Sequence, residues 1–100
     1  MRGRLEDPDA APPAGERVER VAAFRNVVVE QILSGELHAP ADYAQDHDEW
    51  VVVLAGGATL ELDGETMELS AGDWLFLRAG LPHRLVRTQP GTSWLAVRAT

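Results

Sequence analysis

The side chains able to carry chemistry in this 100-residue sequence are few, because the chain contains neither cysteine nor lysine. Without cysteine there are no disulfides, thiolate metal sites or cysteine nucleophiles. Without lysine there is no Schiff-base or P-loop chemistry. The remaining candidates are three histidines, the carboxylates, one tyrosine and nine arginines. Any metal site must therefore be built from nitrogen and oxygen ligands.

Polar side chains alternate along the stretch from Tyr43 to Glu49. If this stretch is a regular strand, every second side chain points to the same face. The residues on that face are Tyr43, Gln45, His47 and Glu49. A phenol, an amide, an imidazole and a carboxylate together indicate either open solvent or a wet pocket. The apolar run that follows, residues 50–54, favours a position near the core.

A second polar face is expected around His83, which follows a strand bounded by glycine turns. By strand parity, His83, Leu85 and Arg87 share this face. If it meets the face that carries Glu49, an imidazole and a carboxylate converge inside the fold. Such a pair suits a first-row divalent metal ion.

The elements that must position these groups read as short β-strands. Apolar runs and period-2 alternation recur with turn residues between them, at spacings of about 8–12 residues. Asp63-Gly64 is expected to form a two-residue hairpin, since both residues tolerate a positive φ. Residues 16–26 fit either a helical turn or the start of a strand, and the valines at 27–29 favour a strand. The sequence therefore predicts an all-β sandwich or small barrel with no helix of normal length.

Two spaced motifs in this sequence resemble those of the cupin superfamily. The second half of the first motif is present as Glu49, six residues and Gly56. The second motif reads Gly72, five residues, the segment 78–83 ending in histidine, three more residues and Arg87. The resemblance covers about residues 43–98. It departs from the family pattern at two positions of the second motif, where Arg78 replaces the usual proline and Arg87 the usual asparagine.

The resemblance implies a cupin-type double-stranded β-helix, which is a small jelly-roll β-barrel with a site inside one end. Residues 17–100 are expected to form this single domain. The resemblance also implies a homodimer, in which the strand Asn26–Leu33 is the candidate to exchange or to pack across the interface.

A metal site is a further implication of the resemblance. The two histidine positions of the first motif fall on Tyr43 and Gln45. The amide oxygen of Gln45 can serve as a ligand, and His47 can replace a missing one only if the strand stays regular. The predicted ligands are Gln45, His47, Glu49 and His83, for Zn, Ni, Mn or Fe(II). The alternative is a barrel mouth whose polar residues bind water or an organic ligand, with Tyr43 and Arg87 in the substrate pocket.

Two main function classes remain open on this evidence. The first is a metal-dependent enzyme acting on a small polar or anionic molecule, with Glu49 or His83 as the catalytic group that moves a proton. The second is a non-catalytic sensor or storage module that holds a small ligand. The missing histidines favour the second class, and the concentration of polar side chains favours the first. A purely structural role through the sheet edges is a weaker third possibility.

The charge balance narrows the range of partners. The net charge is −7 at pH 7, which disfavours nucleic acid and anionic membranes as partners. No apolar run is long enough for a membrane span, and the N-terminus lacks the apolar segment of a signal peptide. We therefore expect a cytoplasmic protein. The proline-rich residues 1–16 are expected to form a flexible tail, and His38 is expected on the surface.

Overall fold

The structure is a computed structural model that describes all 100 residues. Nine β-strands follow a three-residue 3-10 helix, η1, at Pro8–Ala10. The strands are β1 (Glu16–Phe24), β2 (Val27–Ser34), β3 (Ala41–Tyr43), β4 (Glu49–Ala55), β5 (Gly57–Leu62), β6 (Glu65–Ser70), β7 (Trp74–Leu77), β8 (His83–Thr88) and β9 (Thr92–Ala99). The prediction of an all-β jelly-roll barrel is confirmed. No helical segment has the length and hydropathy needed to cross a membrane.

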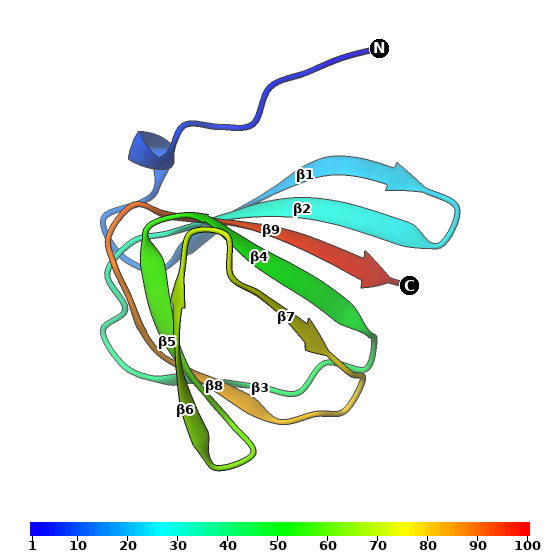
Figure 1. Cartoon of the computed structure of the whole chain (residues 1–100). Helices are drawn as coiled ribbons and strands as arrows, with labels where there is room; N and C mark the ends of the chain where they lie inside the picture. Colours follow the sequence, from blue (N-terminus) through cyan, green and yellow to red (C-terminus); the bar gives the residue numbers. More distant parts are fainter.

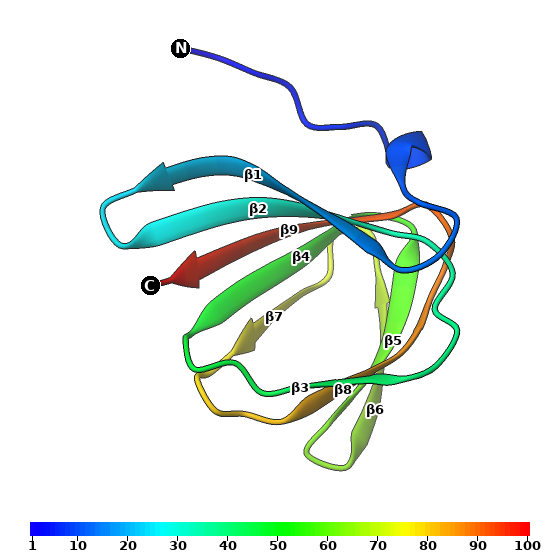
Figure 2. The same ribbon diagram turned by 180° about the vertical axis from the view of Figure 1, so that it is seen from behind.

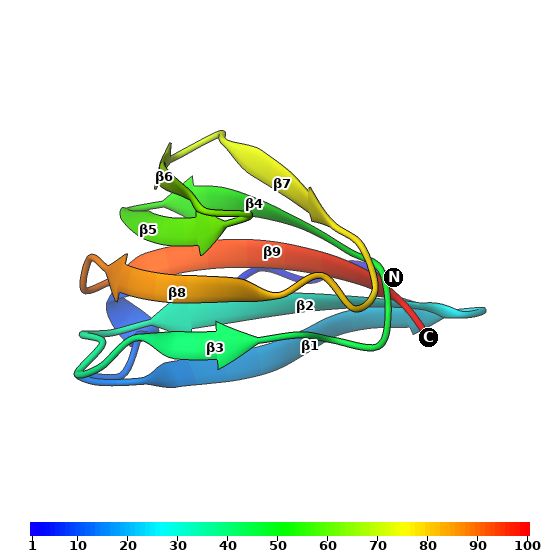
Figure 3. The ribbon, with the colours of Figure 1, turned by 90° about the horizontal axis from the view of Figure 1, so that it is seen from below.

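The strands form two antiparallel sheets that face each other. The larger sheet has the order β1-β2-β9-β4-β7, and the smaller sheet has the order β3-β8-β5-β6. Figure 1 shows the β1–β2 hairpin projecting away from the smaller sheet, beside the C-terminal strand β9. The same hairpin is seen from behind in Figure 2. The view in Figure 3 shows β3, β8 and β5 side by side in the second layer.

Local sequence explains why the strands turn where they do. Asp63 and Gly64 both have positive φ, 52° and 77°, so they form the predicted two-residue hairpin between β5 and β6. Gly56 also has a positive φ of 80°, and a Cβ there would lie 2.5 Å from the Thr92 hydroxyl oxygen. Only glycine satisfies both conditions, which explains the end of the first motif.

The core lies between the two sheets. It consists of nine buried residues from both layers, namely Val51, Val53, Ala58, Leu60, Leu69, Leu77, Leu85, Trp94 and Ala96. Alternation along each strand delivers these side chains to the inside. Polar residues stand at the start of β4 and of β8, where Glu49 and His83 begin these strands.

The structure decides one open alternative of the sequence analysis and differs from it in two details. The segment 16–26, which fitted a helical turn or a strand, is strand β1 and its hairpin turn. β2 is paired on both sides, with β1 and with β9, so the predicted exchanging strand Asn26–Leu33 is not an edge strand. Residues 44–48 leave the β-conformation, so the stretch from Tyr43 to Glu49 is not one regular strand.

The N-terminal segment contacts the barrel before β1 begins. The backbone amide and carbonyl of Glu6 bond to the side chain of Gln31, at 2.8 and 2.9 Å. Further along, the Glu36 amide donates to the Pro13 carbonyl at 3.0 Å. A Cβ on Gly35 would lie 2.0 Å from the Pro12 carbonyl oxygen, so the segment packs closely there. Flexibility of residues 1–16 stays a prediction.

Candidate functional site

A cavity of about 230 Å³ opens between the two sheets at the end of the barrel. Most of its wall is apolar, and its polar groups are few. The apolar lining residues include Val18, Ile32, Val51, Leu60, Leu77, Leu85 and Trp94. The polar lining residues are Glu16, Tyr43, Gln45, Glu49 and His83. An apolar cavity with a small number of polar groups at one end is the usual form of a small-molecule site.

Two crossover loops position the polar groups. The loop 44–48 links β3 to β4, and the loop 78–82 links β7 to β8. The Gly80 amide donates to the Gln45 carbonyl at 2.6 Å, and the Ala79 amide donates to the Asp48 carboxylate at 2.9 Å. These bonds hold the start of β4 close to the start of β8. They therefore fix Glu49 on one sheet near His83 on the other.

His83 is a buried histidine in the cavity wall. It is only 7% exposed, and its ring stacks on Tyr43 with centroids 5.6 Å apart. The Nδ1 atom lies 3.1 Å from the Leu81 carbonyl oxygen. Because a carbonyl oxygen can only accept, Nδ1–H is the donor in this contact, and in the neutral ring Nε2 then keeps its lone pair. No buried side-chain polar atom lacks a partner, so Nε2, which makes no bond within the chain, is accessible to a bound molecule or to solvent.

Glu49 is the half-buried carboxylate of the site. Burial raises the pKa of Glu49 above its ordinary value, against the opposing effects of the nearby His47 and His83 rings. Its Oε2 atom accepts a hydrogen bond from the Gln45 amide nitrogen at 3.0 Å. A carboxyl group whose pKa is raised in a cavity is a candidate to exchange a proton with a bound molecule.

Glu16 is a cavity residue that the sequence analysis missed. One of its carboxylate oxygens accepts from the Tyr43 hydroxyl at 3.3 Å, and the other accepts from Ser34 at 2.9 Å. The Ser34 hydroxyl in turn accepts from the Trp94 indole at 3.1 Å. No local pattern marks Glu16, because its place depends on the long-range pairing of Glu16 with Ser34.

Two of the predicted site residues lie outside the cavity. His47, in the irregular loop, is not among the lining residues, although its ring is near enough to Glu49 to lower the pKa of that carboxyl, and its Nδ1 lies 3.2 Å from the Asp46 carboxylate. Arg87 is exposed and lines a separate small hollow near Gly57. A register shift in the β5–β8 pairing leaves Val86 as an extra residue, so strand parity reverses after Leu85. Thr88 takes the buried position in place of Arg87.

The possible metal ligands in the cavity are fewer than a transition-metal site normally uses. Gln45, Glu49 and His83 line the same cavity, but His47 does not join them. No three histidine, aspartate or glutamate side chains converge closely enough to hold a metal ion. Catalytic zinc sites use three such protein ligands. The residues therefore do not fit a typical transition-metal centre.

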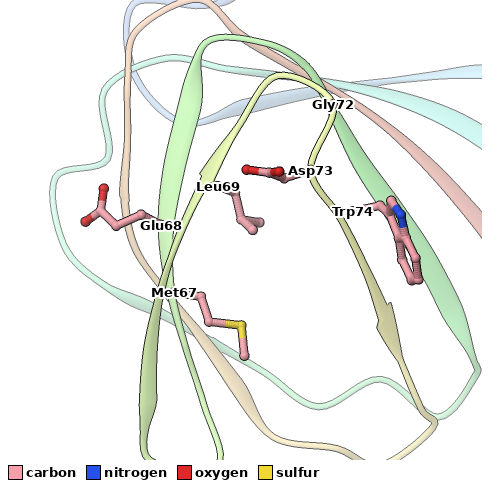
Figure 4. A pocket seen from close by; sticks show the side chains of 6 residues that line it. All are labelled: Met67, Glu68, Leu69, Gly72, Asp73 and Trp74. Atoms are coloured by element: carbon pink, nitrogen blue, oxygen red, sulfur yellow. The ribbon is translucent and has the colours of Figure 1, made fainter.

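Another hollow, between β6 and β7, has fewer polar groups available to bind a ligand. Figure 4 shows its lining, which is Met67, Glu68, Leu69, Gly72, Asp73 and Trp74. Both carboxylates there already have partners: Asp73 accepts from the Ser70 amide, and Glu68 accepts from the Thr59 hydroxyl. The cavity around His83 is therefore the candidate site.

The fold and the cavity define a small jelly-roll barrel with a site at one end, and sequence comparison identifies its family. The cupin-domain family model matches residues 28–97. The chain belongs to the cupin-domain family, as its two motifs predicted.

Solved structures agree with this assignment. A proposed mannose-6-phosphate isomerase from Ralstonia eutropha JMP134 is 30% identical, with a TM-score of 0.79 over 97% of this chain and 98% of that one. KdgF from a Halomonas species is 21% identical, with a TM-score of 0.71 over 85% and 78% of the two chains. The Cupin_2 domain of an XRE-family transcriptional regulator from Enterobacter cloacae is 17% identical, with a TM-score of 0.66 over 85% and 96%. A search of curated protein sequences finds no significant match.

Proposed function

We propose that this cupin domain binds a small organic molecule in the cavity between its sheets. The observation that carries the proposal is a mostly apolar cavity whose wall includes the buried His83 and the half-buried Glu49. Apolar walls with a few placed polar groups are what small-molecule sites use to hold and orient a ligand. At about 230 Å³, the cavity is smaller than the 300–1,000 Å³ typical of drug-sized ligands. This volume favours a small metabolite.

The three tryptophan indoles provide the test. Trp94 lines the cavity, whereas Trp50 and Trp74 lie against each other on the opposite face of the larger sheet, with rings 6.2 Å apart. In nitrogen-15 NMR spectra, a panel of small metabolites that includes mannose 6-phosphate is titrated into the protein. A ligand in the cavity is expected to shift the Trp94 indole signal and to leave the other two unchanged. Shifts confined to Trp50 or Trp74, or none at all, would refute the proposal.

Variants of two histidines sharpen this test. His83→Ala is expected to weaken binding about tenfold or more, because it removes an acceptor from the cavity. His38→Ala is the matched control, since His38 is exposed and is not among the residues that line the cavity. Equal affinities of the two variants for the ligand would show that His83 does not contribute to binding.

A second candidate function is proton transfer on the bound molecule. The raised pKa of Glu49 and the free Nε2 of His83 support it, because the two groups line one cavity and can each hold a proton. The Ralstonia protein is described as an isomerase, and isomerisation of a sugar moves a proton between carbons. The measurement is solvent deuterium exchange into a ligand found by NMR. Exchange that is lost in Glu49→Gln supports an enzyme, and binding without exchange supports a sensor or storage module.

The metal prediction from the sequence is tested separately. Elemental analysis of protein purified without an affinity tag is expected to find well below one Zn, Ni, Mn or Fe ion per chain, because the donor set is incomplete. A stoichiometric metal that disappears in both Glu49→Gln and His83→Ala would instead establish the predicted metal site.

We also propose that the chain forms a homodimer through the outer face of its larger sheet. Strand register places Trp50, Val52, Trp74, Phe76, Leu95 and Val97 together on this face. Trp74 and Phe76 are 60% and 51% exposed. None of these side chains is charged, so a second copy can approach here despite the net charge of −7. Exposed apolar faces of this kind mark protein interfaces.

A further inference from the structure

We infer that the ligand presents a hydrogen-bond-donating, positively charged head, such as a primary ammonium group, to the polar end of the cavity. This inference rests on the proposed binding function. It assigns the chemical class of the ligand from the hydrogen-bonding roles and the charges of the residues around the cavity.

The first line of argument is that most free polar atoms of the site are acceptors, although the Gln45 amide keeps one N–H. In its neutral form, His83 offers the lone pair of Nε2 while its Nδ1–H donates to the Leu81 carbonyl. Glu49 has one carboxylate oxygen bonded to the Gln45 amide nitrogen and the other without a partner in the chain. The Tyr43 hydroxyl, which could donate to a ligand, donates to Glu16 instead. A cavity that offers acceptors is complementary to a ligand that brings donors.

The second line of argument is charge. No arginine lines the cavity. Arg84 pairs with Asp42 at 2.8 Å, and Arg98, which lies opposite Glu49 in the sheet, pairs with Glu30 at 3.1 Å. An anionic head would therefore approach two carboxylates, Glu16 and Glu49, with no arginine in the cavity wall to bind it. A cationic head would gain charge-assisted hydrogen bonds to the same groups.

The apolar wall of the cavity indicates the chemistry of the rest of the ligand. Side chains from both sheets, among them Ile32, Leu60 and Trp94, surround the remainder of the cavity. The structure therefore favours a molecule with a compact apolar body and one cationic end. Three probes share a phenyl ring and differ in the head, which is cationic in benzylammonium, neutral in benzyl alcohol and anionic in benzoate.

The experiment is an NMR titration of each probe at about physiological ionic strength, which screens distant charges. The dissociation constant is read from the Trp94 indole shift. Benzylammonium is expected to bind at least about tenfold more tightly than benzoate, with benzyl alcohol in between. Glu16→Gln and Glu49→Gln are each expected to reduce this preference severalfold, after circular dichroism has shown that they are folded.

Glu65→Gln is the matched control for net charge. Glu65 is exposed in the β5–β6 hairpin and lies outside the cavity, so its substitution changes the total charge equally and is expected to keep the preference. Benzoate binding as tightly as benzylammonium would overturn the inference. So would a preference that survives both Glu16→Gln and Glu49→Gln, or a failure of all three probes to bind. The proposed binding function is judged independently by the metabolite panel, which contains neutral and anionic molecules as well.

Discussion

At the scale of the residue, the candidate site contains two carboxylates that differ in their hydrogen bonds. Glu16 accepts hydrogen bonds on both oxygens, from Tyr43 and from Ser34. Glu49 accepts one from Gln45, and burial raises its pKa. Glu16 is thus fixed in place as part of the cavity wall. Glu49 keeps an oxygen for the ligand and is the group whose protonation can change.

Tyr43 gives a direct measure of the Glu16 contact. Burial raises the pKa of Tyr43 above its usual value, and the charge and hydrogen bond of Glu16 raise this pKa further. Glu16→Gln is expected to lower the Tyr43 pKa partway toward about 10, leaving the effect of burial. Because Tyr43 is the only tyrosine, tyrosinate absorbance reports this group alone. A pKa that is the same in Glu16→Gln and in the Glu65→Gln control would show that the contact is absent in solution.

Glu49 has a predictable effect on stability. Since its pKa is raised in the folded state, the folded protein favours the protonated carboxyl. Its contribution to stability is full below the unfolded pKa of about 4.3 and is lost as pH rises through the higher folded pKa. Glu49→Gln is therefore expected to be more stable than the wild type at neutral pH. In urea melts this gain should vanish near pH 4, and a gain independent of pH would contradict the assignment to Glu49.

At the scale of the element, bends in strands decide which predicted residues reach the cavity. The spacing of the turns correctly predicted short strands, and the Asp63-Gly64 dipeptide correctly predicted a hairpin. Alternation correctly predicted that His83 and Leu85 share a face, which is buried. It failed for Arg87, because the extra residue Val86 reverses the faces of β8.

The prediction for the stretch before β4 failed for a similar reason. His47 lies in a crossover between sheets, where the chain leaves the regular strand. Bulges and crossovers arise from pairing with distant strands, and period-2 patterns in one segment do not reveal them. Glu16 was missed for the same physical reason, since its neighbours in space are distant in sequence.

The N-terminal segment makes a prediction of its own. Gly35→Ala places a methyl group where the Pro12 carbonyl oxygen would be only 2.0 Å away. If the segment packs as in the structure, the free energy of unfolding should fall by about 1–3 kcal/mol, as for other overpacked sites. Gly3→Ala is the matched control, because nothing lies within 4 Å of its Cβ. Equal urea midpoints for both variants would indicate the flexible tail that composition alone predicts.

At the scale of the whole molecule, the two faces of the larger sheet have separate roles. The inner face lines the cavity, and the outer face carries the uncharged surface that we propose as the dimer interface. Both faces are populated by the same strands, because successive side chains alternate between them.

The dimer is tested by placing a charge on the outer face. Phe76→Arg is expected to convert the dimer to a monomer, because a charged side chain would be buried without a partner. Phe76 is 51% exposed in the single chain, so the variant should still fold. Thr66→Arg, on the exposed strand β6 of the other sheet, is the control and should stay dimeric. Light scattering that gives the mass of one chain for the unmodified protein would rule out the proposed interface.

The position of Glu16 also bears on how this domain could diversify. The family model begins at residue 28, yet Glu16 lies upstream of it and still forms part of the cavity wall. Two stretches of chain therefore build the candidate site: the part that matches the family model supplies Glu49 and His83, and the preceding strand supplies a carboxylate of its own. Substitutions in that strand can change which molecules the cavity accepts while every barrel motif stays intact. Relatives with identical motifs can thus differ in ligand, and comparing their leading strands would reveal it.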